Sequence, residues 1–470
     1  MSPAPLHPLL AAARAQYQFL DWEELAAAGA AGRALAAAHP GPGELDAALR
    51  LAGRLLERGM VYKARGRVGW RVAARAPVLP ARHLETLQRL GAVVDRLVTA
   101  AAAALPGSAW LRTRLGFPFR PEEEELLPAA LRHPLSFLRL DLVPDAAGEL
   151  RLIELQTVAG GLGITQALRE VYGPHPALPG IAAGLDEALA VGYRAFCDGA
   201  GRAPAPRPVV GVFVNAASDY RHELFVFASA LRRVEMVVGP WVRPGAAAFP
   251  CLGDGRAPDA LFRFLDSGRV LAGASSFKRT LVRRVAAGEL CMLNPWIDAL
   301  DDKRLLAVVH DEDAEAALGG RLSAADWQTL RAAVPRTWRL DAERGASLKG
   351  RARAERAVYL KKGRSAMSRG LVDGQQENRG RFDAAVDAAV AEGDWVAQEA
   401  VRGGPWPFTV LDPDAGALRE LQGYVRLTPV YGRAADGGVR LCDVCVTARP
   451  QRSRVHGASD ACIVVPVAGG

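Results

Sequence analysis

Two short segments of alternating polar and apolar residues, 137–141 and 152–157, constrain this chain most, because together they predict a β-hairpin. The stretch between them contains Pro144, Asp145 and Gly148, which are typical turn residues. Side chains along a strand point alternately to its two faces, so the polar residues of each segment share one face. The sequence therefore predicts a hairpin with one strongly polar face.

The polar face carries Arg139 and Asp141 on the first strand and Glu154 and Gln156 on the second. Mg²⁺ prefers hard oxygen ligands and usually keeps waters and phosphate oxygens in its coordination shell. We therefore expect the two carboxylates and the amide carbonyl to bind a metal ion that arrives with ATP. Charges that alternate along a hairpin are also typical of a solvent-exposed face, and this segment alone favours neither interpretation.

The residues around this hairpin resemble motifs of a known enzyme class. Glu154-Leu-Gln156-Thr157 and the glycine-rich residues after it are similar to the Glu-x-Asn-Thr motif and small-residue loop of eukaryotic-type glutathione synthetases. The preceding Arg139-x-Asp141 resembles a motif of that family and of glutathionylspermidine synthetases. Both families are circularly permuted ATP-grasp ligases, in which the metal-binding carboxylates precede two lysines that hold the nucleotide phosphates. The resemblance covers residues 135–470 and depends on the order of five segments.

Two downstream segments are similar to the nucleotide-binding parts of the same family. Lys303 follows two aspartates and resembles the first phosphate-binding lysine, and Lys361 resembles the second. The adjacent Lys362 is the alternative to Lys361, because strand register decides which side chain faces the nucleotide. The segment 395–401 resembles the hinge strand that holds adenine and ribose, which implies that Gln398 and Glu399 bind the nucleotide.

The C-terminal part completes the resemblance. Arg449 is similar to the family's substrate-binding arginine, and Gly457 and Ala458 belong to a similar small-residue loop that contacts substrate. The chain departs from the family pattern where Gln156 replaces Asn and where Ser365 replaces a third metal-binding Glu. The number of metal ions therefore stays open.

The resemblance implies an ATP-dependent carboxylate–amine ligase. It would form a peptide or amide bond on a small amino acid or peptide through an acyl phosphate, with Mg²⁺ as cofactor, and would release ADP and phosphate. Arg139 would hold the tetrahedral oxyanion or the departing phosphate; a structural ion pair to Glu154 is an equal alternative. Ester or thioester formation, nucleotide binding without turnover, and an α/β scaffold without a nucleotide are the alternative functions.

We predict an α/β (α+β) chain that combines a permuted ATP-grasp core, an α/β subdomain and a helical N-terminal region. The α/β subdomain rests on apolar strands predicted at 209–214 and 234–238 around a helix at 221–233, a pattern typical of a parallel sheet. The expected parts are a helical region at 1–130, a metal-binding part at 131–205, the α/β subdomain at 206–296, and a nucleotide-binding part with the substrate loop at 297–470.

Composition excludes several other functions. The chain has 470 residues and a net charge of +8, but its arginines are scattered, and no basic tract with aromatics predicts nucleic-acid binding. No apolar run predicts a membrane span, and no P-loop or dinucleotide motif is present. Cys442 and Cys445 form the only close cysteine pair and lack partners at zinc spacing, so buried thiols are expected. We expect a cytoplasmic protein with small-molecule substrates; a homodimer is compatible with the sequence.

Overall fold

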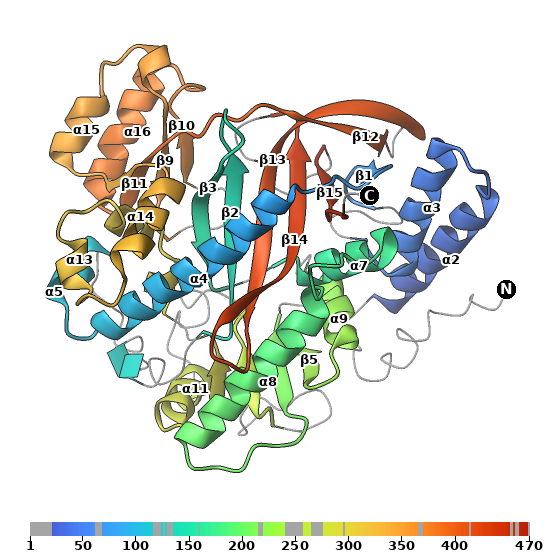
Figure 1. The fold of residues 1–470 in the computed structure, drawn as a ribbon, viewed down its shortest axis with the longest axis horizontal. Helices are drawn as coiled ribbons and strands as arrows, with labels where there is room; N and C mark the ends of the chain where they lie inside the picture. The colour runs from blue at the N-terminus through green and yellow to red at the C-terminus, as the bar shows by residue number, and fades with distance from the viewer. Residues whose placement is uncertain are drawn as a thin grey trace.

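The computed structural model describes residues 21–61, 68–115, 124–125, 127–128, 135–158, 160–214, 220–239, 257–264, 276–294, 297–364, 370–412, 415–451, 455 and 460–468. These residues form helices and three β-sheets (Figure 1). None of the helices in these ranges has the length and apolar composition that a membrane span needs.

The described residues of the N-terminal region form mainly helices, and they also contribute a strand. Its helices are α2 (Trp22–Ala38), α3 (Glu44–Glu57), α4 (Ala81–Ala104) and α5 (Ala109–Arg114). The short strand β1 (Val72–Ala73) pairs antiparallel with β12 (Trp406–Asp412) at the edge of the largest sheet. The N-terminal region is therefore tied to the C-terminal part of the chain.

The largest sheet has seven strands and is held together by the 17-residue β13 (Ala417–Arg433). This strand pairs with β12, with β14 (Val439–Arg449) and with β2 (Phe137–Pro144), and all three pairings are antiparallel. The remaining members are β3 (Leu150–Gln156), which pairs with β2, and β15 (Cys462–Val464), which pairs with β14.

The predicted hairpin is confirmed as β2 and β3. Arg139 lies opposite Gln156, and Asp141 lies opposite Glu154, so the four polar side chains share one face of the sheet. The next pair is Leu142 and Leu152, which leaves one extra residue between Leu152 and Glu154. This irregularity is a β-bulge.

The two faces of the large sheet have different environments. Leu138 and Leu140 point to the face covered by α4, which crosses in front of the sheet in Figure 1. On that face the Tyr431 hydroxyl donates to the Leu87 carbonyl at 2.8 Å, and Gly91 leaves room for the ring because a Cβ there would clash with it. Phe137 points to the other face, where it belongs to the core around α7 (Leu162–Tyr172) and α8 (Ile181–Gly199). The hairpin's polar residues extend along this second face.

A smaller antiparallel sheet has the order β10-β9-β11-β8. Its strands are β8 (Thr337–Arg339), β9 (Val358–Lys362), β10 (Leu371–Asp373) and β11 (Trp395–Glu399). Helices α15 (Ala342–Leu348) and α16 (Arg379–Glu392) cover one face, where Leu360 packs with Phe382 and Val386. Because side chains alternate along β9, Tyr359 and Lys361 point to the opposite face.

The predicted parallel sheet is also present, in the order β5-β4-β6-β7. It consists of β4 (Val209–Phe213), β5 (Glu235–Gly239), β6 (Ala260–Phe262) and β7 (Cys291–Leu293), with helices α9 (Arg221–Ala230) and α11 (Ser276–Ala286). The chain then continues through η1 (Asp298–Asp301), α12 (Arg304–Val308), α13 (Ala314–Ala317), α14 (Ala324–Ala333) and, after β8 and α15, η2 (Arg353–Glu355). The domain boundaries expected from the sequence stay predictions.

Candidate active site

A pocket lies between the polar face of the large sheet and the face of the small sheet opposite α15 and α16. The large sheet contributes residues of β2, β3 and β13, and the small sheet contributes residues of β9, β10 and β11. The polar lining residues are Asp141, Glu154, Lys303, Tyr359, Lys361, Gln398, Glu399, Tyr424 and Arg426. The apolar lining includes Val143, Ile153, Leu371, Val401 and Val425. Segments far apart in the sequence therefore meet around one space.

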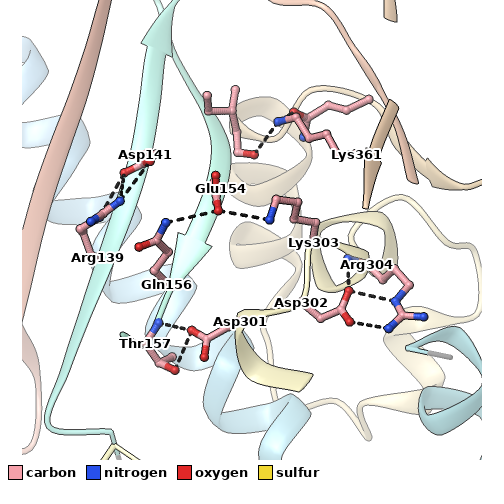
Figure 2. A network of polar contacts seen from close by, with 12 residues as sticks. Arg139, Asp141, Glu154, Gln156, Thr157, Asp301, Asp302, Lys303, Arg304 and Lys361 are labelled. Atoms are coloured by element: carbon pink, nitrogen blue, oxygen red, sulfur yellow. Dashed lines mark hydrogen bonds and ion pairs between the residues drawn. The ribbon is translucent and has the colours of Figure 1, made fainter. Parts of the chain in front are cut away.

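Glu154 is the centre of the charged part of this pocket (Figure 2). Its Oε1 lies 3.3 Å from Lys303 Nζ and accepts a hydrogen bond from Gln156 Nε2 at 3.2 Å. Lys361 approaches from the small sheet. Its Nζ donates to the carbonyl of Ile153, which lies 208 residues earlier in the chain, at 3.1 Å and to Gln398 Oε1 at 2.6 Å. The structure thus brings together the hairpin carboxylate and the two lysines singled out in the sequence.

The electrostatics show an excess of positive charge around Glu154. Burial alone would raise the pKa of Glu154, but the charges of Lys303, Lys361 and Arg139 outweigh it and lower this pKa to about 2. Burial lowers the pKa of Lys361 to about 8, although Glu154 partly opposes the shift. One carboxylate is therefore shared among three cations, and the ammonium group of Lys361 lacks a full negative partner.

The bulge in β3 explains how Lys361 reaches the hairpin. The extra residue, Ile153, is outside the regular pairing of β2 with β3, and its carbonyl accepts the hydrogen bond from Lys361. The adjacent Lys362 points away from the pocket and donates to Glu392 at 2.6 Å. The structure thus directs Lys361, and not Lys362, toward the pocket.

Arg139 pairs with its neighbour on the same strand and not with Glu154. Its Nε and Nη2 donate to the two carboxylate oxygens of Asp141 at 3.2 and 3.3 Å, and its Nη1 donates to the Gly160 carbonyl at 3.1 Å. Burial opposes the charged guanidinium, but the carboxylates of Asp141 and Glu154 outweigh this and raise the pKa of Arg139. The expected alternative of an ion pair to Glu154 is therefore replaced by a bidentate pair to Asp141, and Arg139 is not among the described residues that line the pocket.

A buried carboxylate fixes the loop that Arg139 contacts. Glu223 on α9 accepts hydrogen bonds from the backbone N–H groups of Gly161 and Gly163 at 3.0 and 2.6 Å, at the start of α7. Burial raises the pKa of Glu223 to about 7, although these N–H groups partly oppose the shift. The glycine at 163 is required for close packing, because a Cβ there would overlap the Glu223 carbonyl.

Two aspartates before Lys303 hold its segment between the sheets. Asp301 accepts hydrogen bonds from the backbone N–H and the hydroxyl of Thr157, which directly follows β3. Asp302 is buried in a bidentate pair with Arg304 at 2.9 and 2.5 Å. The Lys303 N–H donates to the Gly363 carbonyl after β9 at 3.2 Å. Lys303 is therefore positioned relative to both the hairpin and the second lysine.

The oxygen donors expected from the sequence, Asp141, Glu154 and Gln156, are of the type that Mg²⁺ prefers, but the arginine contacts of Asp141 restrict its access to a metal ion. The hydrogen bond and the ion pair of Glu154 both go to Oε1, on a face shared with Gln156. Asp141 is only 1% exposed and is contacted by Arg139 and by Arg426, whose Nη1 lies 3.1 Å from Asp141 Oδ2. Asp141 could therefore hold a metal only after one guanidinium group moves. No group of three or more His, Cys, Asp or Glu residues in the described ranges could hold a metal ion.

The remaining predicted residues lie at different distances from this centre. Gln398 is buried between Lys361 and Thr337, to whose hydroxyl it donates at 3.0 Å, and the exposed Glu399 also lines the pocket. Arg449 donates to Asp460 at 2.8 Å and is not among the described lining residues. Gly457, Ala458 and Ser365 lie outside the described residues.

Two polar residues of β13, Tyr424 and Arg426, line the pocket and were not predicted from the sequence. They alternate with the apolar Val425 and Leu427 along β13. This alternation resembles that of the hairpin and could have identified a third polar strand on the same face.

The chain resembles known proteins more in its fold than in its overall sequence. No protein-family model matches the chain, and a search of curated proteins also gives no match. Among solved structures, a glutathione synthetase-like effector (GSS30) from Globodera pallida in its apo form is similar with a TM-score of 0.60 and 13% identity, over 90% of this chain and 97% of that chain. A candidate gamma-glutamylcysteine synthetase from Methylobacillus flagellatus KT has a TM-score of 0.36 and 12% identity, over 78% of this chain and 86% of that chain. The chain therefore shares the overall fold of a glutathione synthetase-like protein.

Proposed function

We propose that this protein is an ATP-dependent carboxylate–amine ligase with a circularly permuted ATP-grasp fold, acting on a small amino acid or peptide. The observation that carries the proposal is the meeting of Glu154, Lys303 and Lys361 in one pocket between two antiparallel sheets. Their order along the chain, with the carboxylate first and the lysines after it, is the order of the permuted ligases that the sequence resembles.

The chemistry follows from the low reactivity of a carboxylate toward amines. In the first step a substrate carboxylate oxygen bonds to the γ-phosphorus of ATP, the bond from that phosphorus to the β,γ-bridging oxygen breaks, and ADP leaves. In the second step the amine nitrogen bonds to the acyl carbon, the carbon–oxygen bond to phosphate breaks, and phosphate leaves. The amine proton passes to phosphate or to solvent.

The pocket residues support these steps through charge. Lys303 and Lys361 would bind the nucleotide phosphates, and an anion beside Lys361 would supply the negative charge that this buried ammonium lacks. Glu154 and Gln156, with Asp141 after loss of one arginine contact, would hold Mg²⁺. The metal ion, when bound, offsets negative charge on the phosphate oxygens.

The two ends of the pocket would bind the adenosine and the substrate. Gln398 and Glu399, beside apolar side chains such as Val401 and Leu371, would contact adenine and ribose. Arg449, on β14 next to the lining strand β13, would bind a substrate carboxylate, and the sequence resemblance assigns Gly457 and Ala458 to the same substrate. Arg139 would orient Asp141 and the loop at Gly160 rather than contact the reacting atoms.

A second candidate is a nucleotide-binding protein of the same fold without ligase turnover. The pairing of Asp141 with two arginines favours it, because this carboxylate is then held by protein groups and not by a metal ion. Such a protein would bind ATP in the same pocket but would form no acyl phosphate.

The test is incubation with ATP, Mg²⁺ and hydroxylamine across a panel of amino acids and short peptides. A ligase is expected to form a hydroxamate with its carboxylate substrate and to release ADP and phosphate. Release of AMP and pyrophosphate in stoichiometric amounts would rule out the acyl phosphate route. ATP binding without any hydroxamate or phosphate release would favour the second candidate.

Glu154→Gln is the informative variant in this assay. We expect it to fold and to lower turnover by about a hundredfold or more, because one electrostatic contact to the transition state is lost. Glu149→Gln, in the exposed turn of the same hairpin, is the matched control and should keep wild-type turnover. Wild-type activity in folded Glu154→Gln would mean that the charged face of the hairpin has only a structural role.

A further inference from the structure

We propose that Arg426 forms an anion subsite in the pocket and binds the phosphoryl oxygens that pass from ATP to the substrate carboxylate. This inference rests on the proposed ligase function and assigns a residue that the sequence motifs do not include.

Arg426 lines the pocket beside the hairpin. It belongs to β13, where Arg426 is paired with Thr447 of β14, two positions from the pair of Tyr424 with Arg449. On its other side its guanidinium reaches Asp141 of β2. Arg426 is therefore flanked by the hairpin that would hold the nucleotide's metal ion and by the strand whose end carries the substrate-binding candidate Arg449.

The contacts of Asp141 leave a surplus cation, and that cation is Arg426. Arg139 uses Nε and Nη2 on the two carboxylate oxygens and Nη1 on the Gly160 carbonyl, so each of its three guanidinium nitrogens has a protein partner. Arg426 has a single ion-pair contact, from Nη1 to Asp141 Oδ2 at 3.1 Å. A single carboxylate cannot neutralise both guanidinium groups.

The Nε group of Arg426 supports the same conclusion. It is buried, and no described residue accepts a hydrogen bond from it. Buried donors in proteins are nearly always paired, so such a group requires an explanation. The side chain as a whole keeps 20% of its surface exposed and lines the pocket. A ligand in the pocket is the partner that would satisfy this donor.

The chemistry of a guanidinium group selects the ligand. Its planar fork presents paired N–H donors that match the oxygens of a phosphoryl group or a carboxylate. The contact with Asp141 places Arg426 on the side of Glu154 and Lys303, where the triphosphate end of the nucleotide would lie. We therefore assign the γ-phosphoryl group as the ligand rather than the carboxylate of the substrate.

Calorimetric titration of the full-length protein tests this assignment. The probes are ADP and the non-hydrolysable β,γ-imido analogue of ATP, each with Mg²⁺, and the quantity is the ratio of their dissociation constants. Arg426→Gln should reduce the preference for the triphosphate analogue by about tenfold to a hundredfold, which corresponds to one charge-assisted hydrogen bond. The affinity of Arg426→Gln for ADP should differ from that of wild type by no more than about twofold. Arg426→Lys, which keeps the charge but not the fork, should give an intermediate loss.

Arg419→Gln is the matched control. Arg419 lies on the same strand, pairs with Asp412 at 3.1 Å and is 60% exposed outside the pocket, so its substitution should leave both affinities unchanged. Melting temperatures of all variants check folding, and Arg426→Lys carries the test if Arg426→Gln is unstable.

Each outcome decides the inference. An Arg426→Gln protein that keeps the wild-type preference, or that loses ADP and analogue affinity equally, would overturn the subsite while the ligase proposal stands. A further titration adds inorganic phosphate or acetate to the ADP-loaded protein. Loss of phosphate binding in Arg426→Gln would support a phosphoryl ligand. Selective loss of acetate binding would assign Arg426 to a carboxylate and overturn the proposed phosphoryl subsite. A wild-type protein that binds neither nucleotide would refute the proposed function and, with it, the subsite.

Discussion

We expect Lys361→Met to stabilise the ligand-free protein and to weaken nucleotide binding at the same time. The pKa of Lys361 is about 8, against 10.5 for an ordinary lysine, so keeping the buried ammonium charged at pH 7 costs about 3 kcal/mol of folding free energy. Methionine has a similar length and removes this cost. The Ile153 carbonyl and Gln398 Oε1 lose their donor, at about 1 kcal/mol each. The expected net gain is about 1 kcal/mol.

The difference in unfolding free energy between Lys361→Met and wild type should depend on pH, and this dependence gives the sharper test. Unfolded lysine keeps its proton up to about pH 10.5, whereas the folded protein releases it above about pH 8. The unfolded state therefore binds more protons in this window, and the wild-type free energy of unfolding rises with pH. The variant lacks this titration, so its advantage over wild type should shrink by about 2.5 kcal/mol between pH 7 and pH 10.

Guanidinium unfolding of wild type, Lys361→Met and Lys362→Met at the two pH values measures this difference. Lys362 is the control because it neighbours Lys361 on β9 but pairs with Glu392 outside the pocket, which raises its pKa. Lys362→Met should not increase the free energy of unfolding at pH 7 and should keep wild-type nucleotide affinity. ATP affinity of Lys361→Met should fall by about tenfold or more. A destabilised Lys361→Met protein with wild-type ATP affinity and no pH effect would refute the reasoning.

Three further predictions concern other groups around the pocket. Arg449→Ala should raise the KM for the substrate far more than the KM for ATP in steady-state kinetics; a raised nucleotide KM alone would reassign Arg449 to the phosphates. Glu223 has a pKa of about 7 in the folded protein against 4.5 otherwise, so its stabilising contribution is full below pH 4.5 and is lost as the pH rises through 7. The unfolding free energy of wild type relative to Glu223→Gln should therefore fall by about 2.5 kcal/mol from pH 5 to pH 8, and a constant difference would contradict the assigned pKa. ATP binding at pH 8.5 should take up protons in wild type but not in Lys361→Met, as calorimetry in buffers of different ionisation enthalpy would detect.

The hairpin could be predicted in detail because its information is local. Alternation predicted that Arg139 and Asp141 share a face and that Glu154 and Gln156 share a face, and the turn residues predicted a hairpin. The register that places Asp141 opposite Glu154 is seen only in the structure. The consecutive apolar residues Leu152 and Ile153 interrupt the alternation and mark the bulge, which is the feature that supplies a carbonyl to Lys361.

Other parts of the site depend on contacts that no local pattern reveals. Thr157 binds Asp301 across 144 residues, and the choice between Lys361 and Lys362 depends on which face of β9 the helices α15 and α16 cover. Arg426 lies on a strand that pairs with β2 only in the folded sheet. Side-chain partners of this kind are set by tertiary packing and not by periodicity.

A crystal structure with the β,γ-imido analogue of ATP and Mn²⁺ in place of Mg²⁺ tests the central claim most directly. We expect the triphosphate to lie between Lys303 and Lys361, Lys361 Nζ to leave Gln398 for a phosphate oxygen, and the anomalous signal of manganese to lie at the Glu154 carboxylate. A nucleotide bound elsewhere, with Lys361 still bonded to Gln398 and no manganese at Glu154, would contradict it.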